Sequence, residues 1–590
     1  MLIVILSWIY ISFITLVCGI LVWRLLCKFI GINDLYKSKL IPHIMIGFAA
    51  QTVYAQFFSL FSGVAALCHI LLLIAAVGSF VLSKNVRDTL LDSLYRVKKV
   101  AISYEGLFYL IFIVFIAFYT SRGDFHTDTG IYHAQAIHYI EKYGVVKGLA
   151  NIQLHLGYNS SYLVFCALYT FSYLPFIGAN AGGSLALHTV TGWLGMVGFI
   201  YSCYGLRRWK CHKRHFSDMA KVAFLIYIFT NITGFMSPAT DYGALMICHY
   251  ILCAWLEMYE DKDCNTYENI ICRSGMLSIF ALFAASMKLS VATLVMIVIY
   301  PLIKLVTAKR WRQLCLFTLI GFISFIPFLI RNVLLSGWLF YPFGSIDLFD
   351  VEWKVPLEYL INDSSQITVW GRCLYDVTKI DLPISSWLPI WWEGQTDYGQ
   401  MIIYGVILSV VMFAITFLYA LKRRMRVHGL LVIYIITLYV NIIFWFMTAP
   451  FIRYGLAFLL TAPLVSIGAF LTVMQYSREG ISSASSIWKV FGVILTGCIC
   501  VCYCDFIDNY AQDDLSFVKQ HISEPYYISQ KPFDCNDEDS MKYGDYTIYI
   551  AGSNEVNSYY KFPGVCYRNM LERSEMMGDK FEDGWKAKTD

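Results

Sequence analysis

The stretch MLIVILSWIYISFITLVCGILVW at residues 1–23 is apolar almost without interruption. A helix rises about 1.5 Å per residue, so about 20 apolar residues are enough to cross the hydrocarbon core of a bilayer. The stretch lacks the basic start and the small-residue cleavage site of a secretory signal. We therefore expect it to be a retained first transmembrane helix.

Similar apolar runs recur along the 590 residues, of which 58% are hydrophobic, 17% aromatic and only 15% charged. A soluble domain carries about 25% charged residues, whereas the mean hydropathy here is +0.58. The composition predicts an all-α polytopic membrane protein and shows no signature of nucleic-acid binding. About fourteen transmembrane helices are expected, at residues 3–23, 41–62, 65–83, 105–120, 184–204, 219–236, 243–258, 272–288, 289–306, 314–331, 401–420, 428–447, 455–474 and 487–504.

Five basic segments lie between these runs, at residues 24–39, 87–99, 207–214, 309–312 and 422–426. Short basic loops of membrane proteins tend to face the cytoplasm. Placing all five inside puts both termini outside the cytoplasm and leaves the longer polar loops on the outer face. The candidate functional residues are therefore expected on that face.

The preference of basic loops for the cytoplasm also argues against residues 159–175 as a membrane crossing. Counting this segment as a crossing would move the basic segment 207–214 to the outside, so it is expected to lie at the interface or to re-enter the membrane. We divide the chain into N-terminal transmembrane helices, a transmembrane core with outer loops at 121–183 and 333–398, and an extracytoplasmic tail. The bounds of these three parts are 1–104, 105–504 and 505–590.

The tail alternates short strand-like runs with glycine and asparagine turns, which predicts a small α+β unit. It also contains Cys535 and Cys566, two of the 18 cysteines of the chain. These two could pair if the tail faces an oxidising compartment.

The first outer loop opens with DFHTDTGIYH at residues 124–133, directly after the membrane exit at Thr120. A helix is expected to start at Asp128 and to end at Gly144. Asp128 could simply cap this helix, and Asp124 could be a solvated loop acid. Alternatively, burial at the bilayer surface could raise the pKa of Asp128 and make it a proton acceptor.

The two acids could also hold a divalent cation such as Mg²⁺ or Mn²⁺. A zinc site is not expected, because the motif does not match a zinc-hydrolase signature. Nearby polar residues add hydrogen-bonding groups for a substrate; they are His126, His133, His138, His155 and Asn159.

Four further charged residues are candidates for substrate binding. Asp241, in SPATDYG, is either a helix cap or a second outer acid, and Lys288 is either a solvated hairpin tip or part of a site. Arg331 and Arg453 are expected at the outer membrane surface, where they could anchor the chain or bind a lipid phosphate through a planar guanidinium. Tyr454 follows Arg453 directly.

Aromatic residues are frequent in the loop 333–398. Trp391 and Trp392 could stack on a sugar, but tryptophans also form the aromatic belt found at membrane interfaces. The sequence leaves both interpretations open.

The stretch DTGIYHAQAIHYIEKYGVVKGLANIQLHLGYNSSYL at 128–163 resembles the first-loop region of large bacterial members of the GT-C superfamily of membrane glycosyltransferases. SPATDYG at 237–243, RNVLLSGWLFYPF at 331–343, DVEWKVP at 350–356 and APFIRYG at 449–455 are similar as well. The familiar acidic signature of the superfamily is a D-x-D, an E-x-D or an adjacent pair, whereas this chain has D-x-x-x-D. Which acid carries the chemistry is therefore open, and Asp128 is favoured.

The resemblance implies a glycosyltransferase of the bacterial inner (plasma) membrane. It would take a hexose or pentose from a polyprenyl-phosphate-linked donor and transfer it, with inversion, to a glycan, lipid or protein acceptor. An acid of the first loop would act as the general base or bind a metal ion.

Two other function classes remain open. An O-antigen-type polymerase or ligase shares many helices and a long outer loop, but depends on outer arginines and a histidine. A transporter or flippase is expected to have internal repeats and charges within the membrane. The predicted crossings show no repeat and are nearly free of charge, apart from His69 and His249.

Overall fold

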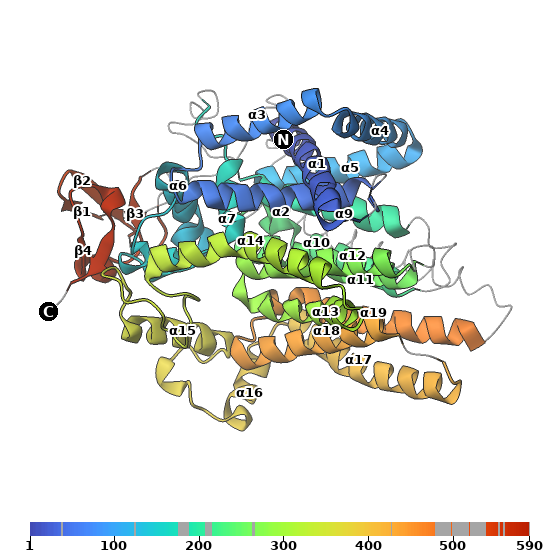
Figure 1. Ribbon diagram of the computed structural model, residues 1–590. Helices are drawn as coiled ribbons and strands as arrows, with labels where there is room; N and C mark the ends of the chain where they lie inside the picture. The colour runs from blue at the N-terminus through green and yellow to red at the C-terminus, as the bar shows by residue number, and fades with distance from the viewer. Residues whose placement is uncertain are drawn as a thin grey trace.

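The computed structural model consists mainly of helices that run side by side, with a small β-structure at one end (Figure 1). It describes the chain except for residues 33, 37–38, 123–125, 175–187, 207–214, 262–265, 426–427, 478–496, 498–518, 520–538, 553–554, 558–560 and 589–590.

The α-helices before the loop at 337–356 are α1 (Leu2–Ile30), α2 (Leu40–Ser59), α3 (Ala66–Leu82), α4 (Lys84–Ala101), α5 (Tyr104–Arg122), α6 (Ala134–Tyr143), α7 (Ser161–Leu168), α9 (Val190–Leu206), α10 (Phe216–Thr230), α11 (Thr240–Glu260), α12 (Tyr267–Met287), α13 (Ile299–Thr307) and α14 (Trp311–Ser336). They are followed by α15 (Leu357–Gly371), α16 (Ile384–Glu393), α17 (Asp397–Lys422), α18 (Gly429–Thr448), α19 (Ile452–Ser477) and α22 (Arg568–Glu572). A π-turn, η1 (Thr129–His133), precedes α6, and short 3-10 helices lie at η2 (Leu149–Asn151), η3 (Leu154–Gly157), η5 (Ile232–Met236), η7 (Val377–Lys379) and η9 (Phe581–Asp583).

Eight of the described helical segments are long and apolar enough to cross a membrane: α1, α5, α12, η6 (Leu289–Val298) continued by α13, α14, α17, α18 and α19. A ninth is obtained if α3 and α4, which meet at an angle of 97°, count as one broken span. The expected number of about fourteen is not confirmed. Helices α9 and α10, with 17 and 15 residues, are short for a bilayer, and residues 487–504 lie outside the described part except for Gly497.

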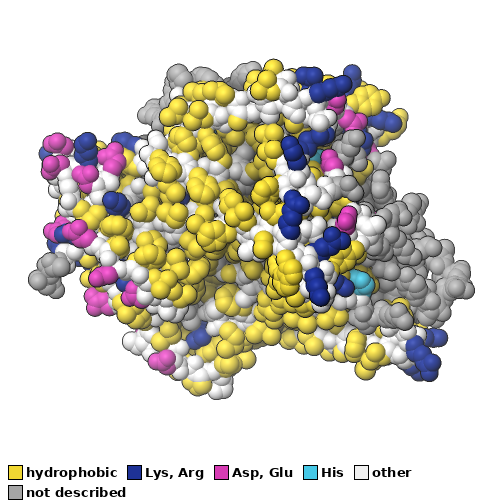
Figure 2. Space-filling view, viewed as in Figure 1, with side chains coloured by type: hydrophobic (Ala, Val, Ile, Leu, Met, Phe, Trp, Pro, Cys, Tyr) yellow, Lys and Arg dark blue, Asp and Glu magenta, His cyan; other side chains and the backbone are white. Residues whose placement is uncertain are grey.

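The two ends of the helical bundle differ in charge. At the sheet end, which carries the strands together with α6, α15 and α16, acids and bases are mixed (Figures 1 and 2). Lysine and arginine gather at the opposite, basic end, and a broad hydrophobic band lies between the two ends. This distribution is the one expected of a protein that crosses a membrane along its helix axes.

Helices α1 and α2 pack closely because glycines face each other's backbone. A Cβ atom on Gly19 would lie 1.8 Å from the carbonyl oxygen of His43, and one on Gly47 would lie 1.8 Å from that of Thr15. Such small-residue contacts let membrane helices pack backbone to backbone.

Segment η6 is a ten-residue 3-10 helix, which is long for this conformation. Its buried residues Val291, Leu294 and Ile297 recur every third position, as expected for a helix with three residues per turn. The described part of the segment, residues 159–174, contains the eight-residue helix α7, whose residues are all buried. Eight residues are too few to cross a bilayer, so α7 is not a crossing, and its burial places it inside the protein.

The tail forms the small mixed unit that its sequence predicts. Strands β1 (Asp539–Tyr543) and β2 (Tyr546–Ile550) are antiparallel, and β3 (Gly564–Val565) adds parallel to β2. Strands β4 (Ser574–Met576) and β5 (Trp585–Ala587) form a second antiparallel pair. The tail shares an apolar cluster with the first loop, in which Trp585 and Phe581 pack with Tyr139 and Leu149.

Candidate functional site

Asp128 stands at the start of the first-loop helix, but its side chain does not cap that helix. The helix begins as the π-turn η1, continues as α6 and ends at Gly144, as expected. Ser237, which lies between η5 and α11, holds this turn through its hydroxyl. The hydroxyl lies 2.6 Å from the backbone nitrogen of His126 and 2.8 Å from the hydroxyl of Thr129. The carboxylate of Asp128 is thus left to make other contacts.

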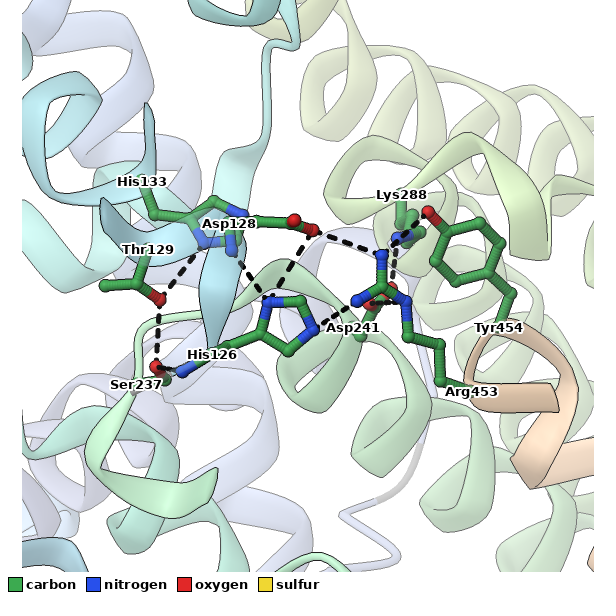
Figure 3. Close-up of polar contacts among 9 residues, drawn as sticks. All are labelled: His126, Asp128, Thr129, His133, Ser237, Asp241, Lys288, Arg453 and Tyr454. Atoms are coloured by element: carbon green, nitrogen blue, oxygen red, sulfur yellow. Dashed lines mark hydrogen bonds and ion pairs between the residues drawn. The ribbon is translucent and has the colours of Figure 1, made fainter. Parts of the chain in front are cut away.

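The partner of Asp128 is Arg453, in the first turn of α19 (Figure 3). The guanidinium Nη2 lies 3.2 Å from Oδ2 of Asp128 and 3.3 Å from the hydroxyl of Tyr454. Its Nη1 contacts Nε2 of His126, whose Nδ1 lies 3.6 Å from the same carboxylate. The first loop and α19 therefore meet through one arginine.

Asp241 joins the same network from the first turn of α11. Its Oδ1 is paired with Nζ of Lys288, and its Oδ2 lies 3.8 Å from Nε of Arg453. Lys288 also lies 3.9 Å from the centre of the Tyr454 ring. Asp241 is therefore not a helix cap, and Lys288 is not a solvated hairpin tip.

These contacts define an acid–base cluster of five residues: His126, Asp128, Asp241, Lys288 and Arg453. The two acids and two bases balance in charge when His126 is neutral. The Asp241 side chain is 8% exposed, whereas those of Asp128 and Arg453 are 26% and 37% exposed. The cluster is thus anchored inside the protein on one side and accessible on the other.

The electrostatics of Asp128 differ from the sequence-based expectation. Burial raises its pKa, but nearby positive charge, chiefly that of Arg453, outweighs burial, so that the pKa lies below its ordinary value. Burial lowers the pKa of His126, and lowers that of His133 to about 3 and that of His155 to about 4. At neutral pH the cluster therefore holds an ionised Asp128 and an uncharged His126, and the neighbouring His133 and His155 are uncharged as well.

A divalent cation would have to compete with these ion pairs. Both described carboxylates are already paired with a base, and within the described ranges no three His, Cys, Asp or Glu side chains are placed to hold a metal ion. Asp124 lies outside the described residues. The two described acids of the cluster are thus engaged with bases.

The structure does not bring Arg331 and Asn159 into the cluster. Arg331 is 2% exposed and donates to Asn159 (3.1 Å), to the hydroxyl of Ser59 (2.5 Å) and to the carbonyl of Gly144 (3.2 Å). Its guanidinium ties α14 to the first loop, so it does not face a lipid phosphate as anticipated.

The tryptophans of the second loop also have packing roles. Trp391 is buried and donates to the carbonyl of Pro450 at 2.9 Å, three residues before Arg453. Trp392 packs edge-on against Tyr404. The His155 ring stacks on Tyr132, and the His133 ring lies tilted against the same tyrosine, so both histidines pack within the first loop.

Charged side chains are also buried within the helices, which was not expected from the sequence. Lys221 of α10 pairs with Glu257 of α11 at 2.7 Å, and Arg273 of α12 pairs with Asp261 at 3.0 Å. These pairs are distant from Asp241 along α11, so they belong to the basic end. Average hydropathy hides them, because single charges barely change the mean of a long apolar run. The predicted near-absence of charge within the helices is therefore wrong.

The other sequence-based candidates are accounted for by packing. His69 bonds to the hydroxyl of Tyr10 (2.5 Å) and the carbonyl of Leu168, and His249 stacks on Phe224. Cys566 is a buried thiol, and Cys535 lies outside the described residues.

The fold and the cluster define a class: a helical protein with spans long enough for a membrane and an acid–base site where its first loop meets α11, α12 and α19. Residues 1–460 match the family described as a domain of unknown function, DUF8201, and the chain belongs to that family. The match contains every residue of the cluster and ends before the tail. No curated protein and no solved structure matches the chain.

Proposed function

We propose that the protein is a membrane glycosyltransferase that takes a sugar from a polyprenyl-phosphate donor and transfers it to an acceptor hydroxyl. The observation that carries this proposal is the direction in which the Asp128 side chain points. Instead of capping its helix, this carboxylate faces Arg453, which lies within 3.8 Å of a second acid, Asp241. A base and a phosphate-binding cation therefore stand side by side at the end of a bundle of apolar helices.

The ion pair explains how an acid with a lowered pKa can serve as a base. An arriving donor phosphate competes with Asp128 for the guanidinium of Arg453, since planar guanidinium binds phosphate well. Once Arg453 turns to the phosphate, the pKa of Asp128 rises because it loses its main positive neighbour. The donor thus prepares the base by the act of binding.

Transfer then follows an inverting course. Asp128 accepts the proton of the acceptor hydroxyl while the acceptor oxygen forms a bond to the anomeric carbon. The bond from that carbon to the phosphate oxygen breaks, and polyprenyl phosphate leaves with the electron pair. Arg453 and Lys288 stabilise the negative charge on the leaving phosphate.

The charge distribution supports an outward-facing site. The cytoplasmic side of membrane proteins is rich in lysine and arginine, and the cluster lies away from the basic end. Arg24, late in α1, bonds to Thr89 of the basic helix α4 at 2.7 Å, so α1 begins toward the other end. We accordingly place the cluster, the tail and both termini outside the cytoplasm of a bacterial inner membrane.

One contact favours a second candidate, an O-antigen-type polymerase or ligase. Such enzymes are expected to depend on an outer arginine and a histidine, and Arg453 contacts His126. In that case activity should survive Asp128→Asn and be lost on His126→Ala. The glycosyltransferase proposal expects the reverse order of severity.

Binding of polyprenyl phosphate, the group that the donor releases, tests the proposal. Full-length protein in nanodiscs is titrated with polyprenyl phosphate, and binding is measured by native mass spectrometry. Arg453→Gln is expected to weaken binding at least tenfold, because a charge-assisted phosphate contact is lost. Arg568→Gln, which removes a surface arginine of the tail, is the control. Equal affinity of both variants and the wild type would contradict the proposal.

A further inference from the structure

The tail packs against the first loop, the same loop in which Asp128 lies. Its backbone approaches the first loop so closely that a Cβ atom on Gly148 would lie 1.9 Å from the carbonyl oxygen of Trp585. The amide of Trp585 donates to the carbonyl of Lys147 at 2.9 Å, and the hydroxyl of Ser574 donates to that of Asn151 at 2.8 Å. The tail and the first loop thus form one packed unit.

Hydrogen bonds continue from the tail into the π-turn, and one of them runs from the thiol of Cys566 to the carbonyl of Ile131 at 3.1 Å. The amide of Asn557 donates to the carbonyl of Gly130 at 3.1 Å. The side chain of Gln153 donates from Nε2 to the carbonyl of Ile131 at 3.1 Å and accepts at Oε1 from the amide of Cys566 at 2.9 Å. Gln153 is fully buried, so both ends of its amide are committed to these partners.

In the π-turn the carbonyl of Gly130 accepts a hydrogen bond from the tail instead of from the helix. In an α-helix the amide of Ala134 would bond to Gly130, but here it bonds to Thr129, five residues earlier. Asn557 takes the place of that amide at Gly130. The wider turn comes directly after Asp128, and such π-turns are frequent at functional sites.

We propose that the tail is a brace that keeps Asp128 aimed at Arg453, with Gln153 and Asn557 as positioning residues. The inference depends on the geometry of the turn and not on which reaction the cluster performs. It also gives a role to a segment that lies beyond the family match at 1–460.

Hydrogen exchange in the full-length protein in detergent tests the brace. Gln153→Met keeps the volume of the side chain and removes both bonds. We expect amides 127–134 to exchange roughly tenfold faster, because two buried hydrogen bonds no longer hold the turn closed. The matched control is Tyr543→Phe, which removes a 2.7 Å bond to the carbonyl of Leu571 inside the tail. It should leave amides 127–134 unchanged.

A pH profile separates positioning from general support of the fold. If the brace is lost, Asp128 drifts from Arg453 and its lowered pKa rises, so the acid-induced fall of the melting temperature moves to higher pH. This move should disappear when Gln153→Met is combined with Asp128→Asn. Should Gln153→Met fail to fold, Gln153→Glu, which keeps the acceptor for Cys566, is read by the same two measurements.

Two results would overturn the inference. One is exchange that rises as much in α12 and α19 as in the π-turn. The other is a pH profile of the variant that runs parallel to that of the wild type.

Discussion

Replacing Lys288 by methionine should destabilise the protein, because it leaves Asp241 with a single cation. The carboxylate of Asp241 is 8% exposed and is paired with Lys288 on one oxygen, while Arg453 lies 3.8 Å from the other. Breaking a buried ion pair costs about 3–5 kcal/mol when no other partner remains. At 3.8 Å and an effective dielectric constant near 20, the attraction to Arg453 amounts to about 4 kcal/mol.

In the variant Arg453 still neutralises part of the charge of Asp241, which reduces the expected cost. The Lys288 side chain is also 21% exposed, so its ion pair is partly screened by solvent. We expect Lys288→Met to cost about 2–3 kcal/mol. Lys288→Met combined with Asp241→Asn should cost about 2 kcal/mol less than the sum of the single changes, since the double variant leaves no unpaired carboxylate.

The free energy of unfolding is measured by denaturant titration in mixed micelles for the wild type, both single variants and the double variant. Lys354→Met serves as the control, because the lysine side chain is buried to a similar extent while its partner Asp347 is 56% exposed and keeps its hydration when the lysine is lost. Additive costs, or a cost of Lys288→Met no larger than that of the control, would refute the assignment of Lys288 to the cluster.

Three further changes probe the surroundings of the cluster. Burial raises the pKa of Glu141 to about 7 from an ordinary value of 4.5, so its contribution to stability is complete below pH 4.5 and is lost as the pH rises through 7. Glu141→Gln should raise the melting temperature at pH 8 and leave it unchanged at pH 4.5; an equal shift at both values would be inconsistent with this pKa. Gly47→Ala should abolish or severely reduce folded protein in size-exclusion profiles, because its Cβ atom would lie 1.8 Å from a backbone oxygen, whereas Gly78→Ala, with open space around it, should not. Trp391→Phe removes the hydrogen bond to Pro450, three residues before Arg453, and should weaken polyprenyl-phosphate binding several-fold because Arg453 is held less firmly. Unchanged binding would show that this hydrogen bond does not position Arg453.

Much of the fold follows from local sequence pattern. Apolar runs correctly indicate the helices, Gly144 ends the first-loop helix as expected, and the run 546–552 contains β2. The number of crossings is not confirmed: α9 and α10 are too short to span a bilayer, and α2 and α11, although 20 and 21 residues long, are not among the described apolar spans.

The site could be predicted residue by residue, but not as a network. Asp128 and Arg453 are 325 residues apart, and nothing local in the sequence shows that they meet. The direction of the Asp128 pKa shift depends on that meeting, so burial alone predicted the wrong sign. Arg331 carries the same signal as Arg453 in sequence, yet its hydrogen bonds are all internal.

The turnover of Asp128→Asn tests the central claim most directly. Wild-type protein and this variant are reconstituted in liposomes with a panel of radiolabelled polyprenyl-phosphate hexoses and pentoses, and release of polyprenyl phosphate is followed. Asp347→Asn, at an exposed loop position, is the control. Loss of a general base predicts a fall in kcat of roughly 10²–10⁴ for Asp128→Asn and none for the control. A variant that turns over within threefold of the wild type, or a wild type that uses no polyprenyl-linked sugar, would contradict the account.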